Sequence, residues 1–72
     1  MTNWTSTNAY TARSAEKLTN DKGYIFKVSW HGGGYCLLIV NPDGKLDSDH
    51  EGLAAWDLAR ILNDWQVEAT PQ

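Results

Sequence analysis

The chain has 72 residues, a net charge of −3 and a single cysteine, so it is long enough for one small domain. One cysteine excludes a disulfide framework, and one cysteine with two histidines falls short of a structural zinc site. Four tryptophans, three tyrosines and one phenylalanine remain to build the core, because aromatic side chains bury large areas. We expect a single domain over 1–72 without a cofactor, with tails at 1–8 and 68–72 that fray.

The first fourteen residues are polar, and no run of about 18 apolar residues occurs anywhere in the sequence. We therefore expect neither a signal peptide nor a membrane partner. A free thiol without an export signal is typical of a reducing cytoplasm, which is the expected location.

The first expected element is a short helix from about Thr11 to Leu18. Ala12 and Ala15 precede Leu18 at three-residue steps, which places all three on one face of a helix. The residues 20–23, Asn-Asp-Lys-Gly, then end the helix with turn chemistry. The polar segment before the helix frays unless its one large apolar side chain, Trp4, enters the core.

A strand is predicted over Tyr24–Trp30. Its apolar positions 24, 26, 28 and 30 alternate with Ile25, Lys27 and Ser29, which is the period of a half-buried strand. Residues 31–34, His-Gly-Gly-Gly, form a flexible hairpin connection to the next strand. That strand, Tyr35–Val40, is apolar at every position, which favours a central strand buried on both faces. Its Cys36 is expected to be a small buried hydrophobic residue.

Residues 41–44, Asn-Pro-Asp-Gly, give the strongest turn signal in the chain. Proline presets the first turn position, Asn41 and Asp43 bond back to the backbone, and Gly44 takes the positive φ that reverses the chain. A short third strand is expected near Lys45–Asp47.

The last expected element is a helix from Ser48 to about Gln66, whose start fits a capping box between Ser48 and Glu51. Its core-facing stripe consists of Ala54, Leu58, Ile61, Leu62 and Trp65. The predicted fold is therefore α+β in the order α–β–β–β–α, a three-stranded antiparallel meander with its helices packed on one face.

The opposite face of this helix carries the candidate partner-binding site, which consists of Leu53, Trp56, Arg60 and Asn63. Arg60 lies four residues after Trp56, where a guanidinium can stack on the indole. An exposed tryptophan beside a leucine and an arginine has the composition of an interface hot spot. The alternative is that the N-terminal segment folds over Trp56 and buries it.

Catalytic and metal-binding patterns are incomplete. Cys36 could be a nucleophile with His31 or His50 as its base, but nothing in the sequence supplies an oxyanion hole or a pocket. Residues 47–52 match the opening of a calcium-binding loop, whose closing acidic ligand would fall on Leu58. We expect neither an enzyme nor a metal site.

The favoured hypothesis is a small acidic, non-enzymatic protein-binding module, for example an inhibitor of a host protein complex of the kind that phages and mobile elements make. One alternative is a self-associating structural or regulatory homodimer that uses Trp56 and Leu53. Another is a small enzyme or ligand-binding domain that uses Cys36 and a histidine. A protein partner is expected under the first hypothesis, and a second copy of the chain under the second.

Direct nucleic-acid binding is not expected, because residues 37–72 carry seven acidic and only two basic side chains. Double-stranded-RNA-binding domains share the expected order of elements, but they need lysines where residues 47–51 read Asp-Ser-Asp-His-Glu. We predict no affinity for duplex DNA or RNA at physiological salt, since an acidic surface repels phosphates. Fluorescence anisotropy with labelled duplexes tests this, and micromolar binding that weakens steeply with salt would contradict it.

Overall fold

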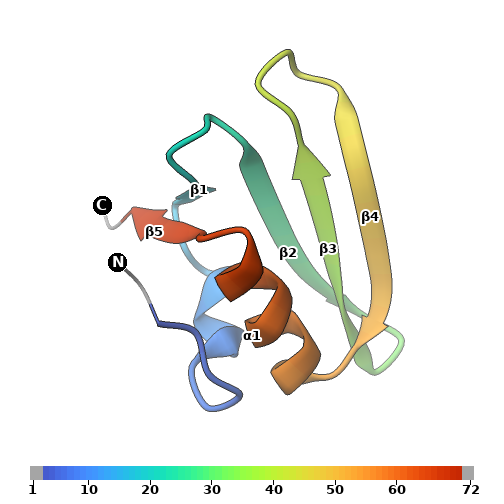
Figure 1. The fold of residues 1–72 in the computed structure, drawn as a ribbon. Coiled ribbons are helices and arrows are strands. Elements are labelled where there is room, and N and C mark those ends of the chain that lie inside the picture. Colours follow the sequence, from blue (N-terminus) through green and yellow to red (C-terminus); the bar gives the residue numbers. More distant parts are fainter. Residues whose placement is uncertain (1–2, 71–72) are drawn as a thin grey trace.

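A five-stranded antiparallel sheet organises the computed structural model, which describes residues 3–70 (Figure 1). The elements in chain order are the 3₁₀ helix η1 (Ala9–Arg13), β1 (Lys17–Thr19), β2 (Ile25–His31), β3 (Gly34–Val40), β4 (Leu46–Leu53), the α-helix α1 (Ala55–Asp64) and β5 (Glu68–Thr70). The strand order in the sheet is β4–β3–β2–β1–β5. Both helices lie on one face, which we call the inner face (Figure 1); the opposite face is the outer face.

The predicted α+β class is confirmed, but the predicted number and order of elements are wrong. The sheet has five strands rather than three, and one α-helix packs on it instead of two. The two extra strands, β1 and β5, are three residues long and pair with each other at one end of the sheet. Strands that short leave no period-2 pattern long enough to recognise in a sequence.

The helix predicted over Thr11–Leu18 is a 3₁₀ turn followed by a strand. Ala9 and Ala12 are both buried three residues apart, because side chains at i and i+3 align in a 3₁₀ helix. Leu18 enters the core from β1 instead, where it pairs with Phe26 of β2 and Ala69 of β5. A three-residue spacing of small apolar residues fits both helix types, and here the tighter one forms.

The hairpin that joins β2 and β3 confirms the two strands predicted within residues 24–40, but its connection is shorter than the predicted 31–34, since His31 and Gly34 pair with each other in the strands. Its two turn residues, Gly32 and Gly33, have φ values of 60° and 82°, which is the type I′ geometry that matches strand twist. The predicted turn at residues 41–44 is confirmed too. Asn41 Oδ1 accepts hydrogen bonds from the backbone N–H groups of Asp43 and Lys45, both at 3.0 Å.

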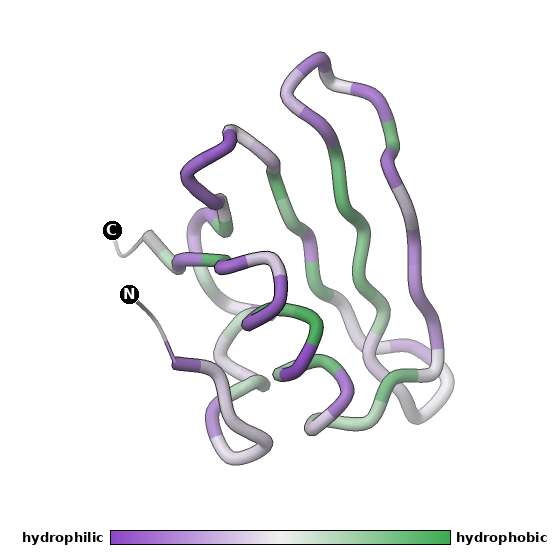
Figure 2. The backbone as a smooth tube through the Cα atoms, viewed as in Figure 1, coloured by the Kyte–Doolittle hydropathy of each residue, from purple (hydrophilic) through white to green (hydrophobic). Residues whose placement is uncertain are grey.

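Strand β3 is covered on one face only, which corrects the expectation of burial on both. Leu37 and Ile39 point inward and are fully buried, whereas Leu38 points outward and is 41% exposed. Cys36 also lies on the outer face and is only partly buried. Most of β3 is hydrophobic although one of its faces is open, while β4 is largely hydrophilic (Figure 2).

The third strand is much longer than predicted, and the capping box at Ser48 does not exist. Ser48 pairs with Ile39, and His50 pairs with Leu37, so both belong to β4. β4 is the edge strand of the sheet, and pairing with β3 satisfies the backbone groups on one side of it over its whole length. This outweighs one favourable helix cap. The helix begins at Ala55 instead, with the exposed Ala54 as an N-cap that makes no side-chain bond.

The predicted apolar stripe of the last helix is confirmed within α1. Leu58 and Leu62 are fully buried, and Ile61 packs against the core at partial burial. Trp65, at the C-terminal cap, lies against Tyr24 and Phe26 with ring centroids 5.0 and 5.8 Å away. Ala54, predicted as the centre of this stripe, is exposed and lies just outside it.

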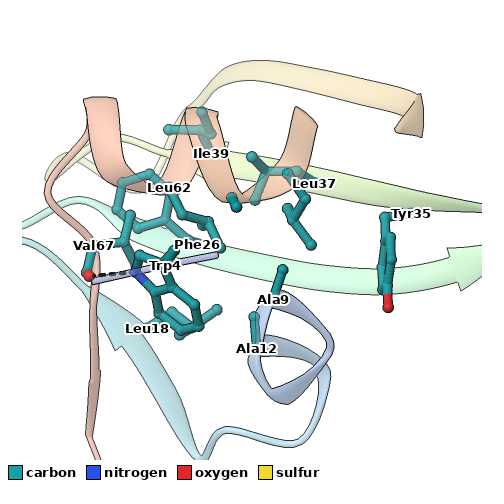
Figure 3. Packing of buried hydrophobic residues seen from close by; sticks show 12 residues of the cluster. Trp4, Ala9, Ala12, Leu18, Phe26, Tyr35, Leu37, Ile39, Leu62 and Val67 are labelled. Carbon is teal, nitrogen blue, oxygen red and sulfur yellow. Dashed lines mark hydrogen bonds between the residues drawn. The ribbon is translucent and has the colours of Figure 1, made fainter. Parts of the chain in front are cut away.

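The N-terminal segment is anchored by Trp4, whose side chain is only 3% exposed. Its indole Nε1 donates a hydrogen bond of 2.8 Å to the carbonyl oxygen of Val67 (Figure 3). Asn63 accepts a bond from the backbone N–H of Trp4 and donates one to its carbonyl oxygen, at 2.9 and 2.8 Å. Residues 1–2 and 71–72 of the expected tails lie outside the described residues.

The tryptophans should differ sharply in their contribution to stability. Trp4→Ala and Trp65→Ala should each lower the free energy of unfolding by about 3–5 kcal/mol, with the larger loss at the almost fully buried Trp4. Trp56→Ala should change it by less than about 0.5 kcal/mol, because Trp56 is largely exposed. Urea denaturation measures all three, and a Trp56 variant that loses as much as the other two would contradict the assignment of faces.

Two glycines near the β2–β3 turn should respond in opposite directions. A Cβ at Gly34 would lie 2.9 Å from the Cα of Gly52 on β4, so Gly34→Ala should cost about 1–3 kcal/mol. Gly32→Asn should be neutral or stabilise by up to about 1 kcal/mol, since asparagine suits the first position of a type I′ turn. Thermal unfolding tests both, and a fully tolerated Gly34→Ala would contradict the close approach of β3 and β4.

Candidate functional site

Trp56, the second residue of α1, is the most exposed large apolar side chain in residues 3–70, at 63%. It is two residues before the buried Leu58, so it points away from the sheet. The N-terminal segment does not cover it. The alternative in which that segment buries Trp56 is therefore wrong, and the predicted exposure is confirmed.

A surface hollow of about 460 Å³ adjoins Trp56. One wall is the N-terminal segment, and the other is the outward side of α1. The lining residues are Trp4, Thr5, Ser6, Trp56, Ala59, Arg60, Asn63 and Asp64. We call this set the Trp56 hollow.

The two walls of the Trp56 hollow are fixed to each other by Asn63, which bonds both backbone groups of Trp4. The N-terminal wall is also braced internally. Thr5 N–H donates to Asn8 Oδ1 at 2.9 Å, and Asn8 N–H donates to Thr5 Oγ1 at 3.3 Å. The shape of the hollow is therefore set before any partner arrives, which lowers the entropy cost of binding.

Two charged side chains near Trp56, those of Asp57 and Arg60, form a long ion pair. Arg60 Nη2 lies 3.4 Å from Asp57 Oδ1, and the Arg60 side chain is 62% exposed. The guanidinium thus contacts Asp57, whereas the sequence predicted stacking on Trp56. Such an exposed pair contributes little to stability, at most about 1 kcal/mol, so the guanidinium can exchange this carboxylate for another one.

The structure brings together three of the four predicted site residues. Trp56, Arg60 and Asn63 line the hollow, but Asn63 also holds Trp4 and so has a structural role. Leu53 is not part of the hollow: it ends β4 and packs partly buried against the core. The N-terminal segment was considered only as a cover that buries Trp56, whereas the structure places Trp4, Thr5 and Ser6 beside it as the second wall of the hollow.

A second recess follows the edge of β2 that β1 leaves open. Only Ile25 and Phe26 of β2 pair with β1, so within residues 3–70 the stretch 27–31 has no strand beside it on that side. Two adjoining hollows of about 460 and 520 Å³ follow this stretch. Both are lined by Arg13 and Val28, and the second also by Trp30 and the exposed Tyr10. We call this the β2-edge recess.

The cysteine and histidines do not converge in one site. Cys36 faces outward next to Ser29, whereas His50 pairs with the inward-facing Leu37, so thiol and imidazole lie on opposite faces of the sheet. His31 shares the outer face with Cys36 but lies two residues further along, about 7 Å. Among residues 3–70, no three side chains of the metal-binding types are grouped to hold an ion.

In the described part of the chain, no helix has the length and apolar character needed to cross a membrane. Comparison of this chain with known proteins finds no matching family, no matching curated protein and no matching solved structure.

Proposed function

We propose that this protein is a non-enzymatic protein-binding module whose partner docks on Trp56 and the hollow beside it. The observation that carries the proposal is the 63% exposure of Trp56 on a helix whose other side carries the fully buried Leu58 and Leu62. An indole left in water on a rigid support is a large source of binding free energy. Tryptophan and arginine together are the residues most enriched at interface hot spots.

The hollow favours a partner that inserts an apolar side chain next to the indole. Trp56 and Ala59 contribute apolar side chains to the lining of the hollow, and Arg60 and Asp64 contribute charged ones. A carboxylate of the partner would replace Asp57 as the ion-pair partner of Arg60. Breaking the existing pair costs little free energy because the Arg60 side chain is exposed. Arg60 then contributes specificity, and Trp56 contributes most of the affinity.

The binding surface is preorganised by the same contacts that stabilise the fold. Leu58 and Leu62 hold α1 on the sheet, and Asn63 holds the N-terminal wall against α1. Only the side chains of Trp56 and Arg60 lose freedom on binding, since the backbone of both walls is already fixed. This favours recognition without rearrangement of the module.

Partner capture should depend on Trp56. Trp56→Ala should weaken it by about 30-fold or more, as expected for the loss of about 2 kcal/mol at a hot spot. Arg60→Ala should weaken it by about fivefold, or about 1 kcal/mol. The measurement is capture of proteins from lysate of the native host on immobilised protein, with quantitative mass spectrometry and a thermal melt of each variant.

Tyr10→Ala is the matched control, because Tyr10 is an aromatic residue of nearly equal exposure, 61%, outside the Trp56 hollow. A partner retained by Tyr10→Ala and lost by Trp56→Ala supports the proposal. Loss with Tyr10→Ala alone would move the binding site to the β2-edge recess. Equal capture by all variants would remove the Trp56 hollow as an interface.

A further inference from the structure

The outer face of the sheet carries an apolar row that crosses three strands. Ile25 of β2 pairs with Val40 of β3, which pairs with Leu46 of β4. Residues paired directly across antiparallel strands point to the same face, so Ile25 and Val40 lie together. Leu46 pairs with Val40 just past a register shift in β4 and borders the two. Ile25 is 38% exposed and Leu46 is 59% exposed. Leu38, two residues from Val40 along β3, extends the patch.

This apolar row is unusual for an open sheet face. Outward positions of an antiparallel sheet are ordinarily polar when water covers them. Here no helix of residues 3–70 lies over the outer face, since η1 and α1 both pack on the inner one (Figure 1). Partly buried Cys36 adds to the same surface. The outer face therefore carries an unpartnered apolar patch, formed by Ile25, Leu38, Val40 and Leu46.

A second row on this face arranges opposite charges about its centre. Lys27 of β2 pairs with Leu38 of β3, and Leu38 pairs with Asp49 of β4. The row thus reads cation, leucine, anion from one flank to the other, and both charged residues are exposed. When a second copy is rotated by 180° about an axis along β3, its cation faces the anion of the first copy and its leucine faces the leucine.

The symmetry can be followed strand by strand. A half-turn about an axis along β3, in the plane of contact, brings a second copy face to face with the first. The half-turn lays β2 of one copy over β4 of the other, so Lys27 meets the partner's Asp49 twice. Leu38 meets its own counterpart at the axis, and Ile25 meets the partner's Leu46. This is an isologous contact with matched charge and matched apolar surface.

We propose that two copies of this chain pair through the outer faces of their sheets, with the two-fold axis along β3. This interface is separate from the Trp56 hollow, which lies on the inner side of the molecule, so it stands or falls independently of the proposed function. It also differs from a dimer built on Trp56 and Leu53.

The area of contact sets the strength of this dimer. Three neighbouring strands of seven, seven and eight residues cover an area of about 23 by 14 Å. That is small beside the roughly 800 Å² per partner of a typical stable interface, so the dimer is weak. We expect it to populate at protein concentrations of about 0.1–1 mM, because a dissociation constant in that range requires only a small free energy of association.

Sedimentation equilibrium across that range measures the dimer. The wild-type protein should approach twice the chain mass, and Leu38→Asp should remain a monomer because it places two carboxylates at the axis. Trp56→Glu should dimerise as the wild type does. A wild type that stays monomeric at the highest concentration overturns the proposal, and so does a dimer lost with Trp56→Glu but kept with Leu38→Asp.

Charge reversal provides a second test, which remains valid even if Leu38→Asp does not fold. Lys27→Glu and Asp49→Lys should each weaken the dimer at least about tenfold, because each sets like charges face to face at two symmetric positions. The combination of both should restore it. Lys22→Glu, a charge reversal in the turn before β2, should leave it unchanged. No rescue by the combination would overturn the proposed pairing.

Discussion

The hydrogen bonds of Trp4 close the domain and determine where its other parts lie. The indole reaches the carbonyl of Val67, and Asn63 holds the Trp4 backbone, so the N-terminal segment is joined to the end of α1 and to the residue before β5. This link places the N-terminal segment along α1 and leaves β5 free to pair with β1. In a chain without a disulfide, it replaces the covalent closure that small domains often need. The Trp56 hollow exists only because this segment is fastened there.

The second constraint is that residues 3–70 supply enough helix for only one face of the sheet. α1 and η1 cover the inner face, where Leu37 and Ile39 are fully buried. No helix of the described residues covers the outer face, although apolar side chains lie there as well. One short chain thus presents two different surfaces: an aromatic one along α1 and a flat apolar one on the sheet. Their separation on opposite sides lets one copy use both at once.

Local signals allowed the sequence to predict the hairpin over residues 24–40, the turn after it, and the buried stripe and exposed tryptophan of α1. Each depends on residues close together in the chain. β1 and β5 could not be predicted, since three-residue strands form only where partners distant in sequence meet them. The acids of β4 fit a helix cap as well as an edge strand, and only pairing with β3 decides between the two. Likewise, Trp56, Arg60 and Asn63 were recognisable on one helix, but the opposite wall comes from Thr5 and its neighbours, far away in sequence.

The closure at Trp4 also bears on how the chain folds while it is being made. Trp4 leaves the ribosome early, and the carbonyl that it binds follows 63 residues later. Until then Leu18 has no β5 against it, and the nascent chain exposes an unfinished core. Contacts of such long range slow folding and prolong the time in which a chaperone can bind. The contacts that complete this core therefore cannot form until residue 67 is clear of the exit tunnel.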